Sequence, residues 1–520
     1  MKSHRFISVT TNIGTVAMLV FLYFFVSFNA PGLVALYAVV AVAVVYAVVY
    51  LTAITLLLNR VNAEQGGPRA GAIERLLLLL LSIVLLAVFV DATVMDYYQP
   101  LSLYDEAIGL LALWWLLLLV SNIAGLFASR SVARALLVAT LAALLSAPFA
   151  ASLWWINAPS VNSEVSLAVD VYTGGEDGYD IYRIPGMVLL PAGSALAAGD
   201  PLESDRILAF AEARRNGALD TGDIDLVMKV SDDGGRSWSD QKVICTHRKD
   251  EQRGKCGNPT PLFDEREGRV VLGYNLSGLE DEGRHHSTVV MSSDDGGLSW
   301  GAPVTIASDN FVFGPGKGIQ KQHPPHAGRL MLPGYIPGSA GAYYSDDHGA
   351  SWKLSPFFEG GNETDLAETG DGRLYLSTRH SAPIGRAPSP NGRLFSISSD
   401  GGDSWPALSL DEALPTPVCQ VAVINGDDEG LIFSNPAHIK SRVKLTLRYS
   451  ADAGATWPRE LLVYPGPTGY SVLAQATDGD ILALYENGNM SYSERISIAR
   501  IPRESLLPSN QNQTDVPPGE

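Results

Sequence analysis

The residues best suited to chemistry are three arginines that lie in or beside strand-like segments of the second part of the chain. Arg183 is in YDIYRIPGMV, Arg379 ends GRLYLSTR, and Arg442 is in NPAHIKSRVKLTLR. A guanidinium group is a planar fork of N–H donors that pairs with both oxygens of a carboxylate. Three such groups that converge would bind one planar anion. A single arginine is usually a surface residue, so the hypothesis depends on elements that bring the three together.

An internal repeat supplies such elements. The pattern S-x-D-x-G-x-[S/T]-W occurs five times, and its copies begin 62, 52, 53 and 52 residues apart, at Ser231, Ser293, Ser345, Ser398 and Ser450. This period matches one propeller blade of four short antiparallel strands. Asp and Gly suit a tight turn and Trp fills apolar space, so we expect these residues to stabilise the fold. Residues 165 to 503 provide roughly six blades, and strands from both ends should close the blade that has no copy.

These repeats resemble the Asp boxes of the sialidase (neuraminidase) superfamily, and Tyr182-Arg183-Ile184-Pro185 resembles that family's YRIP motif. The resemblance extends from about residue 170 to 486. It implies a six-bladed, all-β, sialidase-like propeller. It also implies an exo-α-sialidase that hydrolyses terminal sialic acids from glycans or glycolipids with retention of configuration.

The resemblance assigns the binding residues and the nucleophile. Arg183, Arg379 and Arg442 match the family's arginine triad, which binds the carboxylate of sialic acid. Tyr470, 28 residues after Arg442, matches the nucleophile. Sialic acid carries a carboxylate on its anomeric carbon, which repels an anionic nucleophile, whereas a phenol is neutral until a base takes its proton. Sialidases are accordingly the tyrosine exception among retaining glycosidases.

The general base implied by the resemblance is a glutamate. Glu363 lies 16 residues before Arg379 and matches the family's N-E element. Glu368, five residues later, is the alternative, but the odd spacing places it on the opposite face of a strand. We therefore expect Glu363 to take the proton from Tyr470.

The general acid/base implied by the resemblance is Asp220, which lies six residues beyond Arg214 in EARRNGALDTGDIDLVMKV. A position in a loop lets this carboxylate approach the leaving oxygen. Asp223 is the second choice, and Asp225 falls in a strand-like run that favours a structural role. Arg214 should contact substituents of the substrate.

The last residue implied by the resemblance is Glu486, in LYE, which should orient one arginine of the triad. No sequence motif resembles a zinc, nucleotide or flavin site, so we expect neither a metal nor a cofactor. An alternative function is a sialoglycan-binding propeller without turnover, and a trans-sialidase or an anhydro-forming sialidase would use the same residues. Linkage preference and oligomeric state do not follow from the sequence.

The first 157 residues differ in composition from the rest. They hold 7 Lys/Arg and 6 Asp/Glu, a net charge of +1, so the remainder of the −18 total is −19. Five apolar stretches, at about residues 6–28, 33–58, 76–95, 108–128 and 135–156, are long enough to cross a bilayer. The arginines and lysines of this region lie before the first stretch and in every second connection between stretches. This distribution predicts a cytoplasmic N-terminus and an extracytoplasmic domain after residue 157.

These observations predict a domain order. An α-helical membrane domain of about five transmembrane helices (residues 1–157) precedes the propeller (158–505), and a polar tail (506–520) is expected to be disordered. The protein is then a multi-pass protein of the cell membrane. The sequon at Asn362 lies beside the predicted base, so glycosylation there would obstruct it, which favours a prokaryotic source.

Charge and cysteine content argue against a nucleic-acid-binding protein and against a protein built on a disulfide framework. An acidic domain without a basic run has little affinity for phosphates, so a nucleic-acid partner is not expected. The three cysteines are too few for a disulfide framework and have no C-x-x-C spacing. Cys245 and Cys256 could close a short disulfide loop or stay reduced, and the sequence leaves both open.

Overall fold

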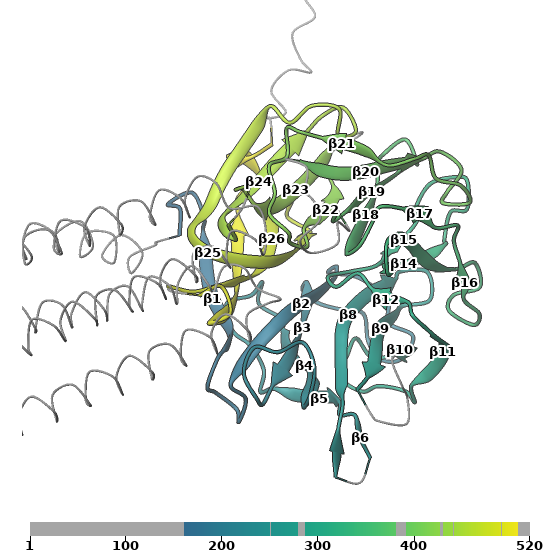
Figure 1. Ribbon diagram of the computed structural model, residues 1–520, viewed down its shortest axis with the longest axis vertical. Helices are drawn as coiled ribbons and strands as arrows, with labels where there is room; N and C mark the ends of the chain where they lie inside the picture. Colours follow the sequence, from purple (N-terminus) through teal and green to yellow (C-terminus); the bar gives the residue numbers. More distant parts are fainter. Residues whose placement is uncertain are drawn as a thin grey trace, which may run out of the picture. The chain divides into compact units, whose positions relative to one another are not determined.

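The computed structural model describes residues 161–507, apart from positions 250, 279–285, 381–391, 427–429, 440 and 490. Within these residues all regular structure is β-strand, except for the short 3-10 turn η2 (Arg503–Ser505). Nearly all neighbouring strands pair antiparallel, and Figure 1 shows small sheets that follow one another along the chain. The described residues therefore form an all-β structure built mainly from local hairpins.

The strands group into six units. The first unit consists of β2 (Ile181–Leu190), β3 (Arg206–Arg214), β4 (Ile224–Ser231) and β5 (Lys242–Cys245). The second consists of β8 (Lys255–Asp264), β9 (Arg269–Ser277), β10 (His286–Ser293) and β11 (Val304–Asp309). The third consists of β12 (Val312–Phe313), β13 (Ile319–Gln320), β14 (Leu330–Ile336), β15 (Ser339–Ser345), β16 (Lys353–Leu354) and β17 (Phe358–Glu359). Between the first two units, β6 (Arg248–Lys249) and β7 (Gln252–Arg253) form a separate hairpin.

The other three units complete the set. The fourth unit consists of β18 (Thr364–Glu368), β19 (Leu374–Thr378), β20 (Arg393–Ser398) and β21 (Ser409–Asp411). The fifth consists of β22 (Ala422–Asn425), β23 (Leu431–Pro436), β24 (Val443–Ser450) and the first part of β25 (Arg459–Gln475). The sixth consists of the rest of β25, β26 (Ile481–Asn487), β27 (Arg495–Ile501) and β1 (Leu167–Thr173). The sixth unit has no Asp box. Its outer strand β1 precedes the other units in sequence and pairs with β27 near the end of the described chain, as the repeat predicted.

The hydrophobic core lies between successive units because each strand sends alternate side chains to opposite faces. In β3, Ile207 and Ala209 pack with residues of the sixth unit, whereas Leu208 and Phe210 pack with residues of the second. Every residue of this strand after its first is buried. A strand buried on both faces reads as a nearly continuous apolar run, which is what the segment ILAFAEA shows.

The five Asp boxes are turns that follow β4, β10, β15, β20 and β24, each before the next strand of its unit. In the first box, Gly235 N donates to Ser231 Oγ at 2.9 Å, and Ser237 N donates to Asp233 Oδ1 at 2.9 Å. The Trp of each box packs against one of five cores between units. The core between the fifth and sixth units receives no such Trp and instead buries Leu506 and Leu507, which follow η2.

The fold class predicted from the sequence requires a correction. In the part of the chain that the structure describes, no helix is long and apolar enough to cross a membrane. The five predicted spans, at residues 6–156, lie outside the described residues. The prediction of an α-helical membrane domain before the propeller, and with it the multi-pass localisation, is therefore wrong on this finding. The supported fold class is all-β, because the regular structure of the described residues is β-strand apart from the short turn η2.

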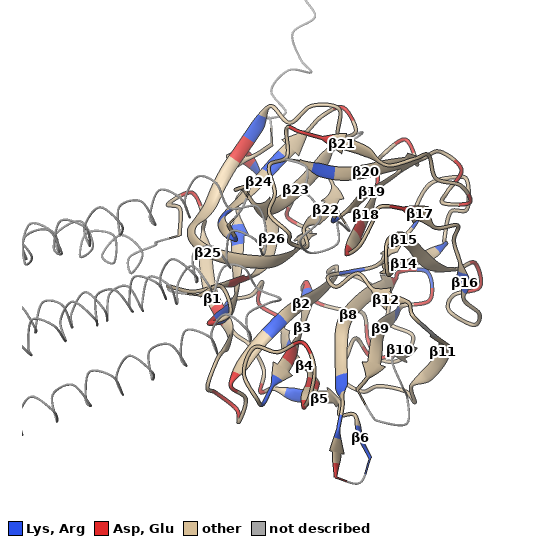
Figure 2. Ribbon diagram, in the orientation of Figure 1, with Lys and Arg blue, Asp and Glu red and all other residues tan. Residues whose placement is uncertain are grey.

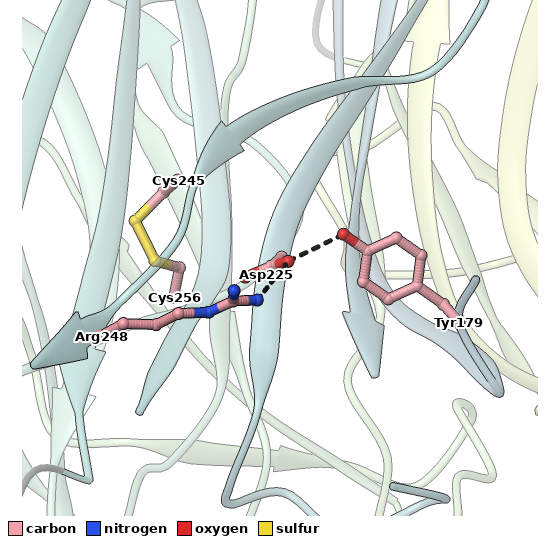
Figure 3. The surroundings of a disulfide bond; sticks show 5 residues. All are labelled: Tyr179, Asp225, Cys245, Arg248 and Cys256. Carbon is pink, nitrogen blue, oxygen red and sulfur yellow. Dashed lines mark hydrogen bonds and ion pairs between the residues drawn. A yellow bond between two sulfur atoms is a disulfide. The ribbon is translucent and has the colours of Figure 1, made fainter. Parts of the chain in front are cut away.

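The alternative left open for two cysteines is resolved by a disulfide bond between Cys245, at the end of β5, and Cys256 in β8. Its Cα atoms are 6.0 Å apart, and it closes the loop that contains the β6–β7 hairpin (Figure 3). Beside it, Asp225 accepts hydrogen bonds from the Tyr179 hydroxyl and from Arg215, both at 2.8 Å. The remaining cysteine, Cys419, is buried and free.

Candidate active site

Contacts link all eight residues that the sequence predicted for the site, although they come from four of the six units. They are Arg183 in β2, Arg214 at the end of β3, Asp220 in the following loop, Glu363 just before β18, Arg379 just after β19, Arg442 just before β24, Tyr470 in β25 and Glu486 in β26. Figure 2 marks basic residues in blue and acidic residues in red along these strands. The pairing of first and second strands in each unit holds these positions in a fixed register.

The centre of the site is a pair formed by Tyr470 and Glu363. The Tyr470 hydroxyl donates a hydrogen bond to Glu363 Oε1, and Arg379 Nη1 donates to Glu363 Oε2 at 2.7 Å. Both residues of the pair are almost fully buried. Burial and the Glu363 charge raise the pKa of Tyr470 well above its usual value, against the opposing charges of three arginines. Tyr470 is therefore a neutral phenol in the free protein, with a proton acceptor in contact.

Glu486 holds Arg183 and the backbone around the site. Its carboxylate accepts hydrogen bonds from Arg183 Nε at 3.0 Å and Nη2 at 3.1 Å. It also accepts the backbone N–H groups of Ile184, at 2.8 Å, and Tyr470, at 3.0 Å. A side chain at Gly469 would collide with this carboxylate, so the glycine allows the close approach. One buried carboxylate thus connects the first arginine to the strand that carries Tyr470.

The backbone next to Arg183 is strained. Ile184 has a φ of 57°, a conformation rare for a β-branched residue, and the pairing of β2 with β3 shifts register between Arg183 and Gly186. Such a bulge re-aims a side chain and is held only where the surroundings fix it. The bond from Ile184 N to Glu486 is the contact that fixes this one.

Two of the arginines keep buried donor atoms without a partner. Within the described chain, Arg379 Nε and Arg442 Nη1 are buried and form no hydrogen bond. The other side of the Arg442 guanidinium donates to Val418 O, with Nη2 at 2.9 Å. Buried N–H groups are rarely left unpaired, because each costs free energy that a partner recovers. An anion bound between these arginines would supply the missing acceptors.

Asp220 is the most exposed of the predicted residues, with 46% of its side chain accessible. Arg214 Nη2 donates to its Oδ1 at 2.8 Å, and Arg183 Nη1 lies 3.9 Å away on another side. Burial raises the pKa of Asp220, but Arg214, Arg183 and Lys255 lower it more, so the net pKa is far below its usual value. The carboxylate is therefore ionised in the free protein.

The alternative carboxylates lie in other networks. Glu368 accepts a hydrogen bond from Lys321 Nζ at 2.6 Å and one from His323 N at 2.9 Å. Asp223 lies 3.4 Å from Arg248 and 3.8 Å from Arg215. In the described chain neither carboxylate forms a hydrogen bond or ion pair with Tyr470 or Glu363, and their networks serve the turn after β13 and the β6–β7 hairpin.

Sequence reasoning missed several residues of the site. Tyr492 is buried, its hydroxyl has no partner in the described chain, and its ring lies 5.1 Å from the Arg183 guanidinium and 5.0 Å from that of Arg442. Burial and the Glu363 charge raise the pKa of Tyr335, which places this phenol near the base. The one available signal for Tyr492 was its position six residues after Glu486, before the last strand.

The net charge of the site is opposite in sign to that of the whole chain. Arg183, Arg214, Arg379, Arg442 and Lys255 supply five positive charges, and Glu212, Asp220, Glu363 and Glu486 supply four negative ones, which leaves +1 in a chain of net charge −18. Among the described residues, no group of three or more His, Cys, Asp or Glu side chains is placed to hold a metal ion. The arrangement can hold an anionic ligand against a phenol that has a base in contact.

Comparison with known proteins identifies the family of the chain. The profile of the BNR repeat-like domain family matches residues 205–483, more than half of the chain. The chain belongs to this family. A sialidase from Micromonospora viridifaciens is 31% identical to it over 354 residues, covering 61% of this chain and 52% of the relative. A sialidase from Bacteroides fragilis is 28% identical over 367 residues, covering 62% and 63%.

Solved structures of sialidases and of an intramolecular trans-sialidase share the fold. A Hadza microbial sialidase superposes with a TM-score of 0.57 at 22% identity, covering 66% of this chain and 69% of that one. The intramolecular trans-sialidase from Ruminococcus gnavus gives 0.54 at 18% identity, covering 66% and 98%. At these identities the likeness shows the sialidase fold alone. This BNR-family chain spans between half and two thirds of the length of the two curated relatives.

Proposed function

We propose that this BNR-family protein is an exo-α-sialidase that releases terminal sialic acids from glycans or glycolipids with retention of configuration. One observation carries the proposal: the Tyr470 hydroxyl donates to Glu363 while three arginine guanidiniums surround the pair. Sialidase relatives that align with 61% and 62% of this chain support the substrate class. A phenol paired with a base and an anion site is the combination that an anionic anomeric centre requires.

In the proposed complex the arginine triad binds the carboxylate of sialic acid. Arg379 Nε and Arg442 Nη1, which have no partner in the described chain, supply donors, and Arg183 adds a guanidinium held by Glu486. Charge-assisted hydrogen bonds of this kind contribute about 1.5–3 kcal/mol each. The guanidiniums of Arg183 and Arg442 both lie over the Tyr470 ring. A carboxylate bound to them would therefore bring the anomeric carbon, C2, close to the phenol oxygen.

In the first step Tyr470 Oη attacks C2 and Glu363 accepts the phenolic proton, so that no phenolate accumulates before the attack. Asp220 gives a proton to the glycosidic oxygen, and the bond from C2 to that oxygen breaks. The products are a covalent sialyl–tyrosine and the free alcohol of the leaving group. The positive Arg379 beside Glu363 stabilises the carboxylate before the transfer.

Asp220 is ionised in the free protein, so it must gain a proton before it acts as an acid. The anionic substrate makes this possible, because a carboxylate bound to Arg183 offsets one of the positive charges that lower the Asp220 pKa. Substrate binding therefore raises the Asp220 pKa. The exposed position of Asp220 lets the proton come from water.

In the second step Asp220 takes a proton from water, whose oxygen attacks C2 as the bond to Tyr470 breaks. Glu363 returns its proton to the phenolate, and Asp220 loses its proton to water as the product leaves, which regenerates the free protein with an ionised Asp220. Two displacements at C2 give net retention. A sugar hydroxyl in place of water would give transfer, and the substrate's own hydroxyl would give an anhydro sugar, with the same residues in the same roles.

The test is release of a fluorogenic aryl sialoside by the full-length protein, with products identified by mass spectrometry. The expected result is turnover by the native protein and a loss on the order of 10³-fold in Tyr470→Phe. Tyr172→Phe is the matched control, because Tyr172 is also a buried tyrosine whose hydroxyl donates a hydrogen bond, here to Ala209 O at 2.7 Å. It should retain full turnover.

The outcomes separate the alternatives. Binding of a sialoside with no release would replace the proposal with a sialoglycan-binding propeller that does not turn over. An anhydro or transferred product instead of free sialic acid would keep the mechanism and change the acceptor. Equal activity of native protein and Tyr470→Phe would reject Tyr470 as the nucleophile.

A further inference from the structure

A buried chain of alternating charges lies behind Asp220, and the mechanism above makes no use of its inner half. Lys255 Nζ lies 2.9 Å from Glu212 Oε1. Glu212 Oε2 accepts a hydrogen bond from Arg214 Nη2 at 2.7 Å, and the same nitrogen donates to Asp220 Oδ1 at 2.8 Å. The order is cation, anion, cation, anion. Each charge therefore acts on the next one along the chain.

Two sheet units are needed to build this chain. Glu212 and Arg214 lie two residues apart on β3, so their side chains share one face of the strand. Lys255 is the first residue of β8, and it pairs with Ile224 of β4 in the parallel bridge that joins the first unit to the second. Asp220 lies in the loop between β3 and β4. Lys255 thus reaches from the second unit toward a loop of the first.

Lys255 is fixed from both of its sequence neighbours. On one side Gly254 O accepts the N–H of Ile224 at 3.2 Å. On the other side Cys256 forms the disulfide with Cys245 (Figure 3). A side chain at Gly257 would collide with both Lys255 and Glu212, so the backbone leaves space for this pair. The lysine therefore has one defined position rather than a mobile surface position.

The inner part of the chain is shielded from water. Glu212 has no exposed surface, Arg214 is 1% exposed and the Lys255 side chain is 14% exposed. Charges in such surroundings are screened less than surface charges. Burial raises the Glu212 pKa, but Lys255 and Arg214 lower it more, so Glu212 is a carboxylate. Asn258 N also donates to it, at 3.0 Å.

We propose that Lys255 and Glu212 are positioning residues that act on Asp220 through Arg214 and so control how readily Asp220 gives up and takes back its proton. The proposal rests on the proposed function of Asp220 as acid/base. Lys255 balances the charge of Glu212, which leaves Arg214 free to share its guanidinium with Asp220. Without Lys255, Glu212 would draw Arg214 away from Asp220. Without the Glu212 charge, Arg214 would act more strongly on Asp220.

Other charged groups near this chain are unchanged by substitutions within it. Arg183 faces Asp220 from β2 at 3.9 Å, and the Tyr335 phenol approaches from the third unit. The cluster of Asp223, Asp225, Arg215 and Arg248 lies beside the same loop and forms its own ion pairs. These groups contribute to the absolute protonation of Asp220. They are the same in every variant compared below.

The experiment measures kcat against pH for 3′-sialyllactose, whose poor leaving group needs the acid, with the full-length protein. In Lys255→Met the loss of a positive charge raises the Asp220 pKa, so the alkaline limb should move to higher pH, by about one pH unit. In Glu212→Gln the loss of a negative charge lowers this pKa, so the same limb should move to lower pH. Lys255→Arg should restore the native profile.

The matched control is Lys321→Met, since Lys321 is also a buried lysine that pairs with a glutamate, Glu368, at 2.6 Å. It should lower the unfolding temperature and leave the profile unchanged. If Lys255→Met does not fold, the double variant with Glu212→Gln removes both charges and should give a nearly native profile. Profiles that do not move, or that move in the same direction in both single variants, overturn the proposal.

The failure of the proposed function is a separate outcome. If the native protein releases no sialic acid from either an aryl sialoside or 3′-sialyllactose, the assignment of Asp220 as acid/base falls. If the native protein is active and only the opposite shifts are absent, the assignment stands and the role of Lys255 and Glu212 falls. The aryl group of an aryl sialoside leaves without needing a proton. The alkaline limb of its kcat profile should therefore shift much less between variants than that of 3′-sialyllactose.

Discussion

The five Asp-box turns and the candidate active site are both rich in polar side chains, but they differ in how completely those side chains are paired. In each turn the Ser hydroxyl accepts from a Gly N–H at 2.8–2.9 Å, and the Asp carboxylate accepts from the backbone and from a hydroxyl. In the site, Arg379 Nε, Arg442 Nη1 and the Tyr492 hydroxyl are buried with no partner in the described chain.

This difference separates stability from function. A turn whose donors and acceptors are matched gains free energy in the folded protein and needs nothing else, and it is repeated because each unit needs one. A site with unmatched donors gives up stability unless a ligand completes it. The indole N–H groups of Trp238, Trp300, Trp352 and Trp405 are also unpaired, but their rings pack in the cores, which accounts for these residues.

The largest expected effect compares two buried glutamates at opposite ends of β18, Glu363 just before the strand and Glu368 at its last residue. Glu363→Gln removes the proposed base and should reduce kcat on a natural sialoside by about 10²–10⁴-fold, because general base catalysis contributes that much. Glu368→Gln weakens the pair with Lys321, so it should lower the free energy of unfolding by about 1–3 kcal/mol and leave kcat within about twofold. Steady-state kinetics and thermal unfolding measure the two effects. Equal losses of kcat would remove the distinction between the residues.

A smaller effect is expected for an arginine. Arg442→Met removes donors proposed for the substrate carboxylate and should raise KM by about 10–100-fold, which corresponds to one charge-assisted hydrogen bond. Arg329→Met is the control, because Arg329 is equally buried but pairs with Asp346 and Asp403, each at 2.7 Å. This variant should lower the unfolding temperature and leave KM unchanged. An unchanged KM in Arg442→Met would contradict its place in the anion site.

The smallest effect concerns acid stability. Although burial opposes it, hydrogen bonds from Ser237, Ser231 and Arg236 lower the pKa of Asp233 to about 2. Because the folded-state pKa is below the unfolded one, the stabilisation is complete above about pH 4 and is lost as the pH falls toward 2. Asp233→Asn should therefore flatten the fall of the unfolding temperature over this range, with activity at neutral pH unchanged. A fall as steep as in the native protein would show that the box aspartates do not contribute.

The sequence by itself determined the repeating unit and the residue types of the site. Ser, Asp, Gly and Trp at fixed spacing specify the box turn locally, and nearly continuous apolar runs such as ILAFAEA specify strands that bury both faces, so the hairpins follow without long-range information. Apolar length alone was a poorer guide. The predicted α-helical membrane domain was the part of the fold class that required correction, and its spans lie outside the described residues.

Only the tertiary structure decided which of several similar residues meet. Glu363 and Glu368 differ by five positions in one short stretch, yet one contacts Tyr470 and the other Lys321, because they lie at opposite ends of β18 and meet different neighbours. Tyr492, Glu212 and Lys255 carry no motif that marks them. They enter the site because separate sheet units bring their side chains within a few ångströms of the arginines, and distances between units are not encoded in any local pattern.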